Sequence, residues 1–156
     1  MEDDPLRSAD AERCRRDRSL SSRPLTLVVD ASVVVPACLA AEGLSVLPDR
    51  DLVAPVLMWS EVRSALHELV WRGEITAADG DAAHEALERC PVRRVEDERL
   101  GGEAWRVADE LGWAKTYDAE YVALARLLGC RAVTLDARLR RGADRLGLVV
   151  SVSELL

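Results

Sequence analysis

Four acidic side chains are the residues of this sequence whose types and spacing could do chemistry. Asp30 follows the aliphatic run LTLVV, and Asp136 follows the run RAVTL. Asp118 opens an almost wholly apolar helical pattern, and Glu61 lies within a helical pattern that starts near Pro55. If the elements that carry them meet at one edge of a sheet, these acids form a cluster of oxygen ligands.

Such a cluster requires a cation, because like charges repel. Two carboxylates about 4 Å apart, at an effective dielectric of about 20, repel by about 4 kcal/mol. Oxygen ligands without His or Cys select a hard ion, so we expect Mg²⁺, with Mn²⁺ as the alternative. Such ions take their remaining ligands from water and substrate phosphates, which predicts phosphodiester hydrolysis by a metal-activated water.

Each of the four acids, taken alone, also has a simpler explanation. Asp30, Asp118 and Asp136 each precede or open a helical pattern, where a capping aspartate contributes about 1 kcal/mol to stability. Glu61 alone is typical of a solvated helix position. Only the joint placement of the four acids favours a functional site.

The elements that must position the acids follow an α/β pattern. The continuous aliphatic run at residues 25–30 is typical of a strand that is buried on both faces. Strands that alternate with helices predict a central, mostly parallel sheet flanked by helices, with ligands bound at the carboxyl ends of the strands. Further strands are expected at 52–55, 92–96, 131–136 and 148–152, and helices at 31–40, 55–73, 76–90, 100–113, 118–128 and 137–147.

Composition and charge limit the class of protein. The chain has 156 residues, 49% of them hydrophobic and 31% charged, which is ordinary for one globular domain. A net charge of −7 argues against a protein that coats nucleic acid nonspecifically. The widely spaced cysteines are typical of reduced thiols, and neither an export signal nor a membrane span is apparent, so we expect a cytoplasmic protein.

The N-terminal segment differs from the rest of the chain. Residues 1–24 carry six basic and six acidic residues and almost nothing to bury. We expect a disordered tail, or a start assigned too far upstream, followed by a domain at residues 25–156.

The acids lie in motifs that resemble a known family. DASVVV, SEV, TYDAEYVALA and TLDARL are similar to the four acidic signatures of PIN-domain ribonucleases, in particular the VapC-like toxins of bacterial toxin–antitoxin pairs. The resemblance runs from about Leu25 to Glu154. It implies a three-layer PIN-like domain, a homodimer, and an antitoxin that wraps around the toxin and blocks its site.

The resemblance also assigns roles to residues. It implies a metal-dependent endoribonuclease whose catalytic and metal-binding residues are Asp30, Glu61, Asp118 and Asp136. Ser32 and Thr134 match the hydroxyl positions of the family, where they would orient a water or a carboxylate. An ordinary helix-start serine and an ordinary strand threonine explain these two hydroxyls equally well.

Basic residues near the last two acids are candidates for RNA phosphate contacts. They are Lys115, Arg138, Arg140 and Arg141. A solvated helix face is the alternative reading of this basic group. The four tryptophans, Trp59, Trp71, Trp105 and Trp113, lie in helical patterns, where core or dimer-interface packing is expected in preference to base stacking.

Two other functions stay open at this point. A noncatalytic PIN-fold module would use the helical faces for protein contacts and would show no metal-dependent activity. An aspartyl-phosphate enzyme would use Asp30 as its nucleophile. This second alternative is weak, because Ser32 stands where the dehalogenase-type pattern places another acid.

Overall fold

The fold is built around a sheet of five parallel strands. The computed structural model describes residues 25–47 and 50–155, so the predicted disordered tail at 1–24 lies outside the described residues. The strands lie in the order β3-β2-β1-β4-β5, and every neighbouring pair is parallel. They are β1 (Leu25–Val29), β2 (Arg50–Pro55), β3 (Arg93–Val95), β4 (Arg131–Thr134) and β5 (Val149–Ser151).

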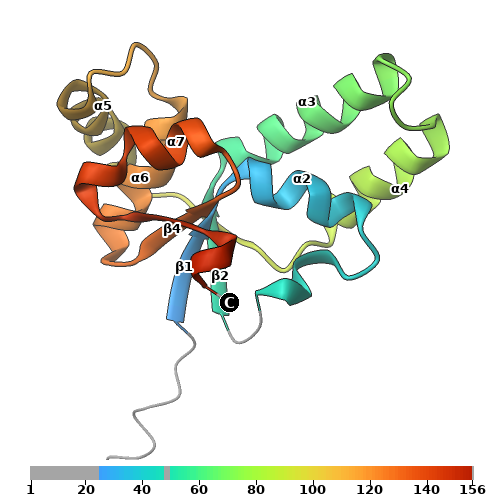
Figure 1. Ribbon diagram of the computed structural model, residues 1–156, viewed down its shortest axis with the longest axis horizontal. Coiled ribbons are helices and arrows are strands. Elements are labelled where there is room, and N and C mark those ends of the chain that lie inside the picture. Colours follow the sequence, from blue (N-terminus) through green and yellow to red (C-terminus); the bar gives the residue numbers. More distant parts are fainter. Residues whose placement is uncertain (1–24, 48–49, 156) are drawn as a thin grey trace, which may run out of the picture.

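Helices cover both faces of this sheet. In Figure 1, α5, α6 and α7 lie on one side of the strands, and α2, α3 and α4 lie on the other. The α-helices are α2 (Ala31–Leu39), α3 (Leu57–Trp71), α4 (Ala77–Glu88), α5 (Leu100–Leu111), α6 (Tyr117–Leu128) and α7 (Ala137–Gly142). Short 3-10 turns are η1 (Gly43–Val46), η2 (Asp144–Leu146) and η3 (Val152–Glu154). The predicted three-layer α/β class is confirmed.

Aliphatic side chains form most of the core, and the sequence contains no Phe. Val28, Val53 and Val133 on the three central strands are fully buried, because a parallel sheet is covered on both faces. Helix α6 is the most deeply buried helix residue by residue, with every side chain from Tyr121 to Ala125 at 0% exposure. Its small alanines let it lie between the sheet and α5.

Local sequence signals explain the ends of the helices. Thr76 accepts a hydrogen bond from the backbone N–H of Asp79 at 3.1 Å, and the reciprocal bond completes a capping box at the start of α4. Gly129 ends α6 in the left-handed conformation with a φ of 64°, which glycine adopts without steric penalty. Both predicted boundaries are confirmed.

Two elements are shorter than the sequence predicted. The strand expected at 131–136 ends at Thr134. Beyond it, the backbone N–H groups of Leu135 and Asp136 donate to the hydroxyls of Ser32 and Thr134, so the chain leaves the ladder. The helix expected at 137–147 ends at Gly142 and continues as the 3-10 turn η2.

The tryptophans do not share one environment. Trp59 is buried and Trp113 packs partly buried against the core. Trp71 and Trp105 are 79% and 66% exposed, so core packing is wrong for these two residues, and the dimer-interface alternative stays a prediction. Cys38, Cys90 and Cys130 are free and partly buried. No helix within 25–47 and 50–155 is long and apolar enough to cross a membrane.

Candidate active site

The candidate site lies at the carboxyl edge of the sheet, between β1 and β4. The chain leaves β1 toward β2 on one side of the sheet and leaves β4 toward β5 on the other, so the two connections diverge. A crevice at such a switch point is the usual ligand site of open α/β sheets. Asp30 directly follows β1, and Asp136 follows β4 by two residues.

Asp30 is held by two hydroxyl groups. Its Oδ2 accepts from Ser32 Oγ at 2.5 Å and from Thr134 Oγ1 at 2.7 Å, and the two hydroxyl oxygens lie 3.1 Å apart. The carboxylate is only 6% exposed. It makes no side-chain cap bond to α2, so helix capping does not explain this aspartate.

Asp136 does act as a helix cap. Its Oδ1 accepts from the backbone N–H groups of Arg138 at 2.7 Å and Leu139 at 3.4 Å. Thr134 Oγ1 accepts from the backbone N–H of Asp136 at 2.9 Å and so links this cap to the buried Asp30. The simpler explanation therefore holds for Asp136, and the cap also fixes this carboxylate beside the first acid.

Asp118 lies in the first turn of α6, but the cap position there belongs to Thr116. Partial burial, together with repulsion from Asp30 and Asp136, raises the pKa of Asp118, and Arg138 opposes that rise. The side chain still reaches the surface, where the neighbouring carboxylates act on it. The electrostatic coupling places Asp118 at the same edge as the other two aspartates.

Glu61 reaches the site from α3, on the opposite side of the sheet from α6. It accepts a hydrogen bond from the hydroxyl of Tyr121. Partial burial raises the pKa of Glu61, and Asp30 and Asp118 raise it further, whereas the bond from Tyr121 lowers it. Burial and the contact with Glu61 raise the pKa of Tyr121 well above its ordinary value, so the phenol stays protonated and donates.

Two further residues act on these acids, Tyr121 and Glu120, and neither was predicted from the sequence. Tyr121 is fully buried and orients Glu61. A signal existed, because a tyrosine within an otherwise aliphatic helix must find a hydrogen-bond partner for its hydroxyl when buried. Glu120 is half-buried, burial raises its pKa, and its charge raises the pKa of Glu61.

No basic side chain of the described residues neutralises the site acids. Within 25–47 and 50–155, none of the four makes an ion pair with a Lys, Arg or His side chain. Among the described residues, no group of three or more His, Cys, Asp or Glu side chains is close enough to hold one metal ion together. The acids thus lie at one edge and influence one another, but their carboxylates are too far apart to bind one metal ion together.

The predicted phosphate contacts divide into two groups. Arg140 donates to Asp144 at 2.6 Å and to Glu154 at 3.0 Å, so a phosphate would have to compete with two carboxylates. Arg138, which influences Asp118, is exposed, as are Lys115 and Arg141. The side chains of these three are accessible to a substrate.

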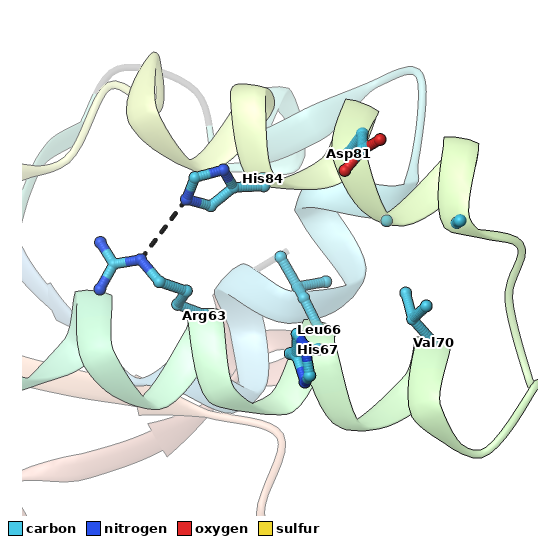
Figure 2. A pocket seen from close by; sticks show the side chains of 8 residues that line it. Arg63, Leu66, His67, Val70, Asp81 and His84 are labelled. Atoms are coloured by element: carbon cyan, nitrogen blue, oxygen red, sulfur yellow. Dashed lines mark hydrogen bonds between the residues drawn. The ribbon is translucent and has the colours of Figure 1, made fainter.

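A separate cavity lies between α3 and α4, away from the acids. It has a volume of about 380 Å³ and contains none of the four acids among its lining residues. Figure 2 shows His84 on α4 facing Arg63 on α3, whose Nε donates to His84 Nε2 at 3.4 Å. His67 and His84 are exposed residues of these helices.

Comparisons with known proteins agree with this geometry. A family profile described as "PIN domain" matches residues 27–145. Ribonuclease VapC9 of Mycobacterium tuberculosis (strain ATCC 25618 / H37Rv) is 37% identical over 114 residues, which cover 72% of this chain and 87% of that protein. Ribonuclease VapC3 of the same strain is 36% identical over 130 residues, which cover 79% and 91%.

Solved structures show the same fold. The crystal structure of PAE2754 from Pyrobaculum aerophilum matches with a TM-score of 0.65 and 27% identity, covering 86% of this chain and 95% of that chain. A toxin–antitoxin complex from Klebsiella pneumoniae matches with a TM-score of 0.58 at 14% identity, which supports the fold alone. The chain therefore belongs to the PIN-domain family, among its VapC-like members.

Proposed function

We propose that this chain is an endoribonuclease that hydrolyses RNA phosphodiesters and acts as the toxin of a toxin–antitoxin pair. The observation that carries the proposal is the group of four acids at the switch point of the sheet, which repel one another and form no ion pair within the described part of the chain. Their number and position suit phosphodiester chemistry, and the names of the relatives VapC9 and VapC3 support RNA as the substrate.

Divalent metal is the cofactor that suits this donor set. Asp30, Glu61, Asp118 and Asp136 offer only carboxylate oxygens, which favours Mg²⁺ or Mn²⁺. Their lack of cationic partners and the raised pKa values of Glu61 and Asp118 fit a site that awaits an outside cation. A bound divalent ion would activate a water and neutralise charge on the phosphate.

The residues of the chain have distinct tasks in this proposal. Ser32 and Thr134 orient the carboxylate of Asp30 through their hydroxyl bonds. Tyr121 orients Glu61, whose raised pKa suits it to accept the proton of the attacking water. Arg138, with Lys115 and Arg141, attracts the RNA phosphates to the four acids at the carboxyl edge of the sheet.

The proposed partners follow from the same site. An antitoxin with a cationic segment would neutralise the acids and exclude RNA. We also propose that the toxin is a homodimer and that it cleaves RNA in the cytoplasm.

The decisive test is the substitution Asp118→Asn. We expect it to abolish Mn²⁺-dependent RNA cleavage and calorimetric Mn²⁺ binding while the circular dichroism spectrum stays unchanged. Asp97→Asn is the matched control, because Asp97 is an acid paired with Arg99. Cleavage by the Asp118→Asn protein would refute the proposal. Absence of metal binding and cleavage in the unsubstituted protein would favour the noncatalytic interaction module.

A further inference from the structure

An exposed aromatic residue directly precedes one of the site acids in the chain. Tyr117 is the first residue of α6, is 59% exposed and directly precedes Asp118. Leu135, 54% exposed, directly precedes Asp136. Two of the acids therefore each have a large apolar neighbour that the core does not use, although exposing such side chains to water is unfavourable.

The segment that leads into Tyr117 is fixed on α7. Trp113 packs so closely against Gly142 that a β-carbon there would lie 2.9 Å from Cζ2 of the indole. No side chain larger than hydrogen fits at Gly142 without a shift. This contact ties the connection between α5 and α6 to the helix that carries Arg138, so Tyr117 is presented by an anchored element.

We propose that Tyr117 stacks on an unpaired nucleobase next to the scissile phosphate and so positions the RNA. The inference rests on the proposed function. An aromatic face accepts any nucleobase and contributes about 1–3 kcal/mol per stacked base. Such a neutral contact is valuable here, because the acids repel the phosphates that flank the reacting one and the chain carries a net charge of −7.

The other exposed aromatic side chains lack this placement. Trp71 is the last residue of α3, and Trp105 lies in the middle of α5. Neither is adjacent in the chain to one of the four acids. They are therefore matched controls with equal or greater exposure.

The experiment measures kcat/KM on a single-stranded RNA that the unsubstituted protein cleaves, with Mn²⁺ present. We expect Tyr117→Leu to lower kcat/KM by about 10- to 100-fold, mainly through KM. Tyr117→Trp should stay within about threefold of the unsubstituted protein, because an indole also stacks. Trp71→Ala and Trp105→Ala should leave kcat/KM unchanged, and thermal melting should confirm that every variant is folded.

A second readout identifies the stacked base. One abasic site is moved along the RNA, one position at a time. A single abasic position beside the cut should slow the unsubstituted protein by the same factor as Tyr117→Leu, and should have no further effect on that variant. The inference would be overturned if Tyr117→Leu had full activity, or if every abasic position slowed Tyr117→Leu by the same factor as the unsubstituted protein. Either result would leave the proposed function intact. A protein that cleaves no RNA would overturn both.

Discussion

Two surface acids, Asp97 and Glu154, and the acids at the carboxyl edge of the sheet have opposite electrostatic surroundings. The contact with Arg99 lowers the pKa of Asp97 to about 2, and the contact with Arg140 lowers the pKa of Glu154 to about 2. At the carboxyl edge, burial and neighbouring carboxylates instead raise the pKa of Glu61. Arg99 and Arg140 form ion pairs with these two surface acids. Within the described residues, no Lys or Arg side chain forms an ion pair with any of the four site acids.

This difference indicates that the acidic edge lowers the stability of the fold. A carboxylate placed beside other carboxylates destabilises the fold, whereas one placed beside an arginine does not. Unfavourable groups of this kind are characteristic of functional sites. The acidic edge is thus the place where the proposed divalent cation would relieve the repulsion.

The largest expected effect concerns activity. Glu61→Gln should lower the rate of RNA cleavage by about 100- to 1,000-fold, because it removes a charge from the metal site and a proton acceptor. Glu154→Gln, a change of the same chemistry at a surface acid, should leave the rate within about twofold. Equal losses in the two variants, measured under single-turnover conditions, would contradict the distinction between the two regions.

A second effect concerns the hydroxyl that holds Asp30. Thr134→Val should lower the free energy of unfolding by about 1–3 kcal/mol, because Asp30 loses a buried hydrogen bond and stays desolvated. Thr134→Ser keeps a hydroxyl and should retain most of that stability. Urea unfolding measures both. A Thr134→Val protein as stable as the unsubstituted one would mean that the Ser32 hydroxyl alone satisfies Asp30.

A third effect has the opposite sign. With a chelator present to remove divalent metal, at pH 7, Glu61→Gln should raise the free energy of unfolding by up to about 1 kcal/mol. The substitution removes a half-buried negative charge that Asp30 and Asp118 repel. The folded-state pKa of Glu61 lies above its unfolded value, so the unsubstituted protein loses stability as pH rises through that interval. The variant should lack this loss. Thermal melting between pH 4 and pH 7 would detect it, and a destabilised variant would contradict the repulsion.

The smallest effect is the loss of stabilisation by the surface residue Glu154 at low pH. The folded pKa of Glu154 is lowered to about 2, so its stabilisation is complete above the unfolded pKa of about 4.3 and is lost as pH falls toward 2. Unfolding experiments at pH 6, 4 and 3 should show the difference between the unsubstituted protein and Glu154→Gln shrinking with acidity. A constant difference would mean that the Arg140 contact contributes through packing and not through charge.

Much of the fold could be predicted because its signals are local. Aliphatic runs mark the strands, and Thr76 and Gly129 mark helix ends through their own backbone chemistry. The positions of Asp30 and Asp136 at one edge then follow from the parallel order of the strands. The end of β4 was less predictable, because a contact with Ser32, distant in the sequence, decides it.

The sequence by itself determined the α/β class with its parallel sheet and predicted the set of acids, since periodicity and residue type act over a few neighbouring residues. Only the tertiary structure decided that Asp136 caps a helix while Asp30 does not, and that Arg140 is paired with Glu154. It also decided that Tyr121 serves Glu61, from a position 60 residues away in the chain. Hydrogen bonds and charge pairs depend on distances of a few ångströms, and folding brings residues from separate elements to those distances.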